Sequence, residues 1–111
     1  MEASAGRGPQ TRACQEVKVY YTEAAEIDLI QIGVYTFTQW GERQWTKYSA
    51  LLAAECEEII PQNIRHALAV PERPELLRWR CEHHMIYFRR APGGIEIVRI
   101  LHERMLPRNH L

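Results

Sequence analysis

The chain has 111 residues, 46% of them hydrophobic, and its 14 lysines and arginines balance its 14 aspartates and glutamates. This length suffices for one domain with its own core, without disulfides or a structural metal. Three widely spaced cysteines argue against a disulfide framework, and no apolar run approaches the ~20 residues of a membrane span. The composition therefore argues against a membrane protein and a disulfide-rich secreted domain. We expect a cytoplasmic protein with no membrane contact.

The zero net charge conceals two halves of opposite sign. Residues 17–60 carry three cations and seven anions, whereas residues 61–111 carry nine arginines, five glutamates, no lysine and all five histidines. Arginines at strand ends either keep a sheet soluble or bind carboxylate and phosphate groups through the guanidinium fork. The sequence leaves both interpretations open.

The first half of the chain predicts a strand followed by a helical hairpin. Residues 1–16 lack periodicity and are expected to form a mobile extension, so the domain spans residues 17–111. Residues 17–21 alternate like a strand, with one inward face: Val17, Val19 and Tyr21. Thr22 is placed to cap a helix that ends near Trp40-Gly41. Its predicted apolar side comprises Leu29, Ile32 and Tyr35, widened by Ile30 and Phe37.

A second helix is predicted from near Glu42 to Pro61. Its apolar residues step by 3, 4, 4 and 3: Trp45, Tyr48, Leu52, Cys56 and Ile59. Residues 62–75 contain Pro71 and Pro74 and predict a loop. Three aliphatic residues should hold this loop against the core: Ile64, Leu68 and Val70.

Three strands are predicted to complete the fold, at residues 77–81, 85–90 and 95–101. Tight turns around Glu82-His83 and Pro92-Gly93 make them an antiparallel meander. Five of the seven residues of the last strand are aliphatic, so we expect it at the centre of the sheet with both faces covered. The predicted fold is α+β, in the order β-α-α-β-β-β, with a helical hairpin packed on a small, mostly antiparallel sheet.

Several segments of residues 17–111 resemble a known family. The most specific, residues 95–105, reads Ile-Glu-Ile-Val-Arg-Ile-Leu-His-Glu-Arg-Met and precedes a short tail ending His110-Leu111. Further matching positions are Ala25, Asp28-Leu29, Tyr35, Trp40-Gly41, Tyr48, residues 77–80, His84 and residues 86–88. In these residues the chain resembles the ParE branch of the RelE/ParE toxins of bacterial type II toxin-antitoxin modules. It departs from the pattern at Glu82-His83, where members often have glycine, and at Leu106-Pro107, where an aspartate commonly follows the methionine.

The resemblance implies the same fold and a growth-inhibiting toxin of a plasmid-stabilising module, neutralised by a cognate antitoxin. ParE-like members inhibit DNA gyrase, whereas RelE-like members cleave messenger RNA at the ribosome. A fold shared by both classes does not choose between them. A third possibility is a non-toxic arginine-faced module that binds DNA, although the sequence predicts no helix with a basic exposed face.

A ribonuclease on this scaffold would need cations and a group for proton transfer. The candidates are Arg80, Arg99 and Arg104 as cations, with His102 or His110 for proton transfer. RelE-like nucleases generally use lysine as well, and here no lysine follows Lys47 and no tyrosine follows Tyr87. We therefore favour an inhibitor that acts by binding, without catalytic residues or a cofactor, and keep the ribosome-dependent nuclease as the alternative.

The remaining polar residues of the second half receive separate interpretations. Candidate target-binding residues lie at the chain end: His102, Arg104, Arg108 and His110. Candidate antitoxin-binding residues are Ile30, Phe37, Trp45, Arg78 and Arg80. Arg99, inside an aliphatic strand, needs a partner, which would be Glu96 or a helix carboxylate. His84 is expected to close a hairpin through backbone hydrogen bonds. Cys81, His83 and His84 share one tight turn and cannot converge on one ion, so no metal site is predicted.

Overall fold

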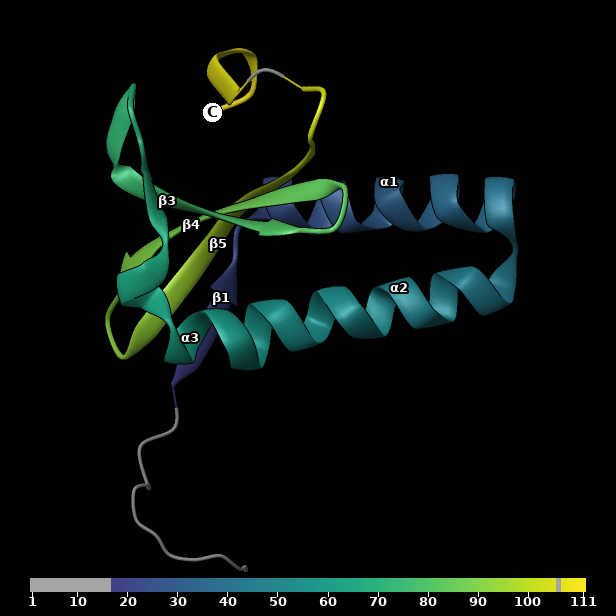
Figure 1. Cartoon of the computed structure of the whole chain (residues 1–111), viewed down its shortest axis with the longest axis horizontal. Helices are drawn as coiled ribbons and strands as arrows, with labels where there is room; N and C mark the ends of the chain where they lie inside the picture. The colour runs from purple at the N-terminus through teal and green to yellow at the C-terminus, as the bar shows by residue number, and fades with distance from the viewer. Residues whose placement is uncertain (1–16, 106) are drawn as a thin grey trace, which may run out of the picture.

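The structure, a computed structural model, describes residues 17–105 and 107–111, apart from the side chain of Arg108. Two long helices, joined as a hairpin, pack against one face of a five-stranded sheet (Figure 1). The helical elements are α1 (Glu23–Trp40), α2 (Glu42–Ala54), the π-helical turn η2 (Glu55–Ile59), α3 (Ile60–Gln62), and the 3₁₀ turns η3 (Ile64–His66) and η4 (Pro107–Asn109). The strands are β1 (Lys18–Tyr21), β2 (Leu68–Val70), β3 (Arg73–Cys81), β4 (His84–Ala91) and β5 (Gly94–His102). The expectation for residues 1–16 lies outside the described residues.

The sheet has the order β1-β5-β4-β3-β2, with β1 parallel to β5 and every other pair antiparallel. The predicted α+β hairpin-on-sheet fold is confirmed. The predicted central position of β5 is wrong: β5 is an interior strand, but β4 is the middle strand of the sheet. The difference comes from β2, which was predicted as loop and adds a strand beyond β3. Within that segment Val70 is 2% exposed, whereas Leu68 is 61% exposed and does not join the core.

The start of α1 contacts β5 at the point where the pairing with β1 ends. Tyr21 is the last residue paired with β5, opposite Ile97. Thr22 then donates its hydroxyl to the carbonyl of Val98 at 2.7 Å and accepts from the backbone N–H of Ala25 at 3.0 Å. The predicted cap is therefore confirmed, and the same side chain joins the helix to the strand.

The buried side of α1 differs from the predicted apolar stripe. It consists of Ala25, Asp28, Ile32, Gly33 and Thr36, with Leu29 partly buried. Tyr35, predicted to face the core, is 63% exposed. Gly33 lies under the indole of Trp45, where an added Cβ would come within 2.9 Å of the ring. Small residues on α1 thus allow close contact with α2, and several of its large apolar residues face outward.

The π-helical turn η2 changes which side of the second helix is buried. Leu52 and Cys56 face the core as predicted, but Ile60 is fully buried and Ile59 is 40% exposed. A π turn adds one residue to the helical repeat, which rotates the following residues about the axis. The helix also continues past Pro61 to Gln62 instead of ending at the proline.

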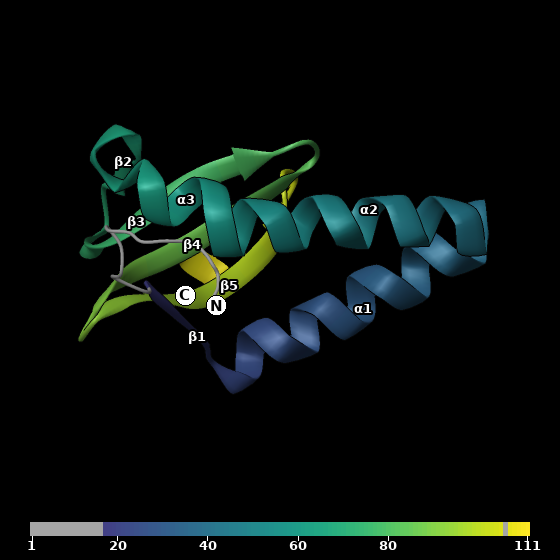
Figure 2. The ribbon, with the colours of Figure 1, turned by 90° about the horizontal axis from the view of Figure 1, so that it is seen from below.

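Both faces of β5 are covered, as predicted. Ile95, Ile97 and Ile100 join the main core beneath the helices. On the opposite face, Leu101 belongs to a smaller cluster with Val70, Leu76 and Tyr87, against which Leu111 packs. The C-terminal tail therefore folds back onto the sheet. At the other end of the molecule, the tip of the hairpin projects beyond the sheet (Figure 2).

Candidate functional site

The end of β5 meets the β3–β4 turn and forms a polar cluster, which we call the strand-end cluster: Tyr48, Arg80, His83, His84, His102 and Glu103. Backbone pairing joins the two segments, because the N–H of Glu103 donates to the carbonyl of His83 at 2.9 Å. Glu82, at the tip of the turn, has a φ of 55°, in the left-handed region that favours glycine. Of the polar residues that follow the last strand, His102 and Glu103 therefore meet partners from the preceding hairpin.

The outer layer of the cluster is an ion-paired network. The Glu103 carboxylate accepts from Arg80 Nη1 at 2.8 Å and lies 3.2 Å from His83 Nδ1. Arg80 also donates to the carbonyl of Glu82 at 3.0 Å. The hydrogen bond from Arg80, followed by that from His83, lowers the pKa of Glu103. Arg80 is thus neutralised by its own chain, although its side chain stays 56% exposed.

The inner layer is a half-buried pair. The Tyr48 hydroxyl lies 2.6 Å from His84 Nδ1 and 3.4 Å from the carbonyl of Cys81, and the His102 ring packs edge-on against His84. Burial, and then the neighbouring His102, lower the pKa of His84 to about 4, while burial raises the pKa of Tyr48 to about 12. Neither group carries charge at neutral pH. His84 closes the hairpin as predicted, but its partner is a tyrosine on α2 and not the backbone.

Arg99 is held in a separate site beneath the tail. Its Nε and Nη2 donate to the two carboxylate oxygens of Asp28 at 2.8 and 2.9 Å, and its Nη1 donates to the carbonyl of His110 at 2.7 Å. Asp28 also accepts from the backbone N–H of Ile100 at 2.9 Å. The hydrogen bond to Asp28 raises the pKa of Arg99. A helix carboxylate is therefore the partner, which confirms one of the two predicted alternatives.

The structure divides the candidate nuclease set between these two places. Arg80 and His102 meet in the strand-end cluster, and the exposed Arg104 follows it, with its backbone N–H on His102 Nδ1 at 3.2 Å. Arg99 lies with Asp28, and His110 contributes a backbone carbonyl there. The side chain of Arg108 is outside the described residues. Asp28 was not singled out from the sequence, although a carboxylate on the same helix side as Ala25 and Ile32 signals a buried partner for an arginine.

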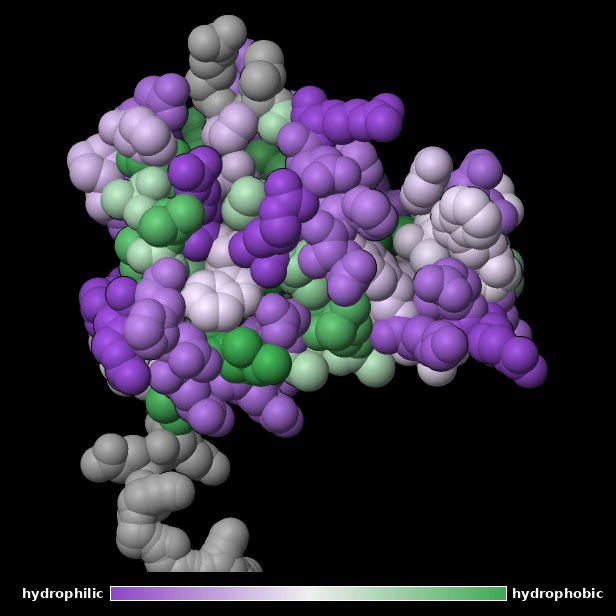
Figure 3. All heavy atoms as spheres, viewed as in Figure 1, coloured by the Kyte–Doolittle hydropathy of each residue, from purple (hydrophilic) through white to green (hydrophobic). Residues whose placement is uncertain are grey.

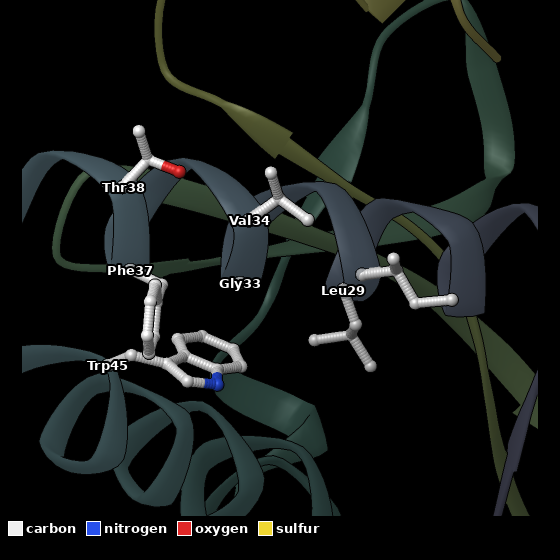
Figure 4. A pocket seen from close by; sticks show the side chains of 7 residues that line it. Leu29, Gly33, Val34, Phe37, Thr38 and Trp45 are labelled. Carbon is white, nitrogen blue, oxygen red and sulfur yellow. The ribbon is translucent and has the colours of Figure 1, made fainter. Parts of the chain in front are cut away.

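The outward side of the hairpin carries an apolar groove, which we call the hairpin groove: Leu29, Ile30, Gly33, Val34, Phe37, Thr38 and Trp45 (Figure 4). Three predicted antitoxin-binding residues, Ile30, Phe37 and Trp45, come together here. The other two, Arg78 and Arg80, lie on the sheet face turned away from the helices, because their strand neighbours Leu77, Trp79 and Cys81 pack in the main core. In the view of Figure 3, hydrophilic side chains cover most of the surface and hydrophobic ones form separate areas.

Comparisons with known proteins agree with this geometry. Residues 19–107 match the family described as the ParE toxin of the type II toxin-antitoxin system parDE. The chain belongs to the ParE toxin family. No curated protein sequence matches it.

Two solved structures share its fold. One is the chromosomal ParDE toxin-antitoxin system from P. aeruginosa, with a TM-score of 0.67, 20% identity, and coverage of 79% of this chain and 97% of the other. The second is the toxin-antitoxin complex RelBE2 from Mycobacterium tuberculosis, with a TM-score of 0.60, 14% identity, and coverage of 80% and 93%. Within the described residues of this ParE-family chain, no helix is long and apolar enough to cross a membrane, and no three metal-binding side chains are grouped to hold an ion.

Proposed function

We propose that the chain is a growth-inhibiting toxin that binds DNA gyrase in the cytoplasm, performs no chemistry of its own, and is neutralised by a cognate antitoxin. The family membership carries the toxin assignment. We favour binding over cleavage because candidate catalytic cations are already paired with carboxylates of the chain itself. A phosphoryl-transfer site needs cations aimed at the reacting phosphate.

Two of those cations already have carboxylate partners within the chain. All three kinds of guanidinium nitrogen of Arg99 are engaged, two on Asp28 and one on His110. Arg80 is paired with Glu103. His84, the half-buried histidine of the cluster, is held neutral. These contacts support a rigid scaffold that presents exposed groups such as Arg104 to a protein target.

For the antitoxin, we propose a partner that uses two surfaces. Its apolar residues would fill the hairpin groove at Ile30, Phe37 and Trp45, which is an exposed apolar patch of the kind that marks interaction sites. Its carboxylates would reach Arg78 on the sheet face turned away from the helices, and at Arg80 they would take the place of Glu103. The Nε of Arg78 has no hydrogen-bond partner among the described residues, and because this atom is itself buried, the carboxylate would bind the other guanidinium nitrogens. A segment that spans both faces must wrap around the domain, as partners that order on binding do.

The test is a pair of assays on the purified chain. We expect inhibition of gyrase supercoiling and no ribosome-dependent cleavage of messenger RNA; cleavage without supercoiling inhibition would identify the RelE-like nuclease instead. If induction leaves growth untouched and the chain binds duplex DNA with steep salt dependence, it is a DNA-binding module.

A matched pair of variants localises the target-binding surface. Arg104→Ala should melt like the parent, because this exposed side chain lies outside the core, but should weaken gyrase inhibition. If its guanidinium makes a charged hydrogen bond to the target, the loss is about 1–3 kcal/mol of binding. Arg90→Ala, an exposed arginine at the other end of β4, is the control and should leave inhibition unchanged. Equal effects of the two substitutions would remove Arg104 from the target surface.

A further inference from the structure

Helix α1 carries a second apolar stripe on the side opposite its buried face. The stripe consists of Ile27, Ile30, Val34 and Phe37, which are 46%, 65%, 63% and 53% exposed. These residues step by 3, 4 and 3, which is the spacing of the a and d positions in a two-helix coiled-coil seam. Helix α1 therefore presents apolar residues on two sides, one packed toward the core and one, the stripe, exposed.

The charges around the stripe would complement those of a second α1 helix that runs antiparallel to the first. The residues flanking the middle of the stripe are uncharged: Gln31, Gly33, Thr38 and Trp40. Glu23 and Glu26 lie at the start of α1, whereas the hairpin tip just past its end carries the exposed Arg43 and Lys47 against the exposed Glu42, a net positive charge. An antiparallel copy of α1 would therefore place its acidic start beside the basic hairpin tip of this chain, and its neutral middle over the neutral middle here.

The axial positions agree with such a pairing. The stripe is centred near Ile32, and Glu26 lies six residues before it, about 9 Å along the helix axis at the usual rise. Helix α1 ends at Trp40, about 12 Å on the other side of the same centre, and Arg43 follows where the chain turns back after Gly41. A two-fold axis through the centre of the stripe would bring Glu26 of each copy to the level of Arg43 of the other.

We propose that two copies of the chain associate through antiparallel α1 helices, with the stripe as the seam and Glu26 of each copy beside Arg43 of the other. The interface is isologous, so both copies use the same residues and the association closes at a dimer. The hairpin tip projects beyond the sheet, which leaves it accessible to the second copy (Figures 1 and 2). Ile30 and Phe37 belong to both the seam and the hairpin groove, so an antitoxin seated there would separate the copies; this last consequence alone rests on the proposed function.

Sedimentation velocity of the full chain in reducing buffer tests the proposal. The sedimentation coefficient should rise from the monomer to the dimer value with concentration between about 1 and about 100 µM, as mass action requires. Val34→Glu should keep the chain monomeric throughout. Leu68→Glu is the matched control, because Leu68 is similarly exposed, at 61% against 63%, but lies on β2 away from the hairpin. A parent chain that stays monomeric, or equal effects of the two substitutions, overturns the proposal.

Charge reversal tests the direction of the pairing. Glu26→Arg alone and Arg43→Glu alone should each raise the dimer dissociation constant, by about tenfold for a close pair. The double variant should return it toward the parent value, because the reversed charges again face each other. Circular dichroism checks that each variant remains folded. Additive weakening in a folded double variant would contradict the antiparallel arrangement.

Discussion

Replacement of Asp28 by alanine should be among the most destabilising single changes in this domain. Asp28 is 6% exposed and accepts three hydrogen bonds, two from Arg99 and one from the backbone of Ile100. Removing one member of a buried ion pair leaves the other charge without compensation, at a cost of about 3–5 kcal/mol. The Arg99 side chain is 21% exposed, which places the expected loss near the lower end, about 3 kcal/mol. At about 4–8 °C per kcal/mol, the melting temperature should fall by roughly 12–24 °C.

Two further variants separate the pair from its surroundings. Arg89→Ala removes a partner from an exposed pair on the neighbouring strands, where Arg89 Nε lies 2.7 Å from Glu96, and should cost less than about 1 kcal/mol. Asp28→Leu combined with Arg99→Met removes both buried charges and should recover part of the loss, leaving about 1–2 kcal/mol for the unsatisfied N–H of Ile100. Urea denaturation measures all three. If Asp28→Ala costs no more than Arg89→Ala, the buried pair does not hold α1 to β5 and the reasoning is wrong.

Three other changes test separate parts of the structure. Burial lowers the pKa of His84 to about 4, whereas histidine in the unfolded chain titrates near 6.5, so the unfolded chain binds more protons between these pH values. The free energy of unfolding should therefore fall as pH drops through this range, by up to about 1.4 kcal/mol per pH unit. His84→Gln should remove that pH dependence. Gly33→Ala should destabilise by about 1–3 kcal/mol despite its better helix propensity, because the new methyl meets the Trp45 ring; a rise in melting temperature would show that the ring moves aside. Deletion of residues 107–111 removes the His110 carbonyl from Arg99 and Leu111 from the sheet cluster, so thermal denaturation should show a loss of about 1–3 kcal/mol, whereas an unchanged melt would mean that the tail is not docked.

The order of elements was predictable because its local signals are strong. Thr22 before two glutamates marks the start of α1, Gly41 with a φ of 92° marks the end, and the Pro92-Gly93 turn joins two aliphatic strands. Strand β2 gave no such signal, since three residues just before Pro71 are too few to show alternation. Its pairing with β3 is decided by tertiary contacts.

The faces of the helices were less predictable than their limits. Helix α1 is apolar on more than one side, so periodicity selected Tyr35, whereas packing against β5 and Trp45 requires the smaller Ala25 and Gly33. In the second helix, the π-helical turn moves burial from Ile59 to Ile60, which a fixed repeat of 3.6 residues does not anticipate.

The polar clusters depended on distant residues. The sequence showed that Arg99 needs a partner but left Glu96 and a helix carboxylate open, because a separation of 71 residues carries no spacing signal. The pairing of Tyr48 with His84 was missed for the same reason, as 36 residues separate them. The sequence alone could not assign the arginines to catalysis or to recognition. Only the structure shows which guanidinium groups already have carboxylate partners.

The stoichiometry of gyrase inhibition tests the central claim, that this ParE-family chain acts by binding, most directly. A fixed amount of gyrase is titrated with the purified chain, and supercoiling is followed over time at each ratio. The account predicts that inhibition depends on the ratio of the two proteins, does not grow with incubation time at a low ratio, and is relieved by added gyrase. Loss of supercoiling that continues to accumulate at a low ratio, or messenger RNA cleavage on ribosomes in place of any inhibition, would contradict it.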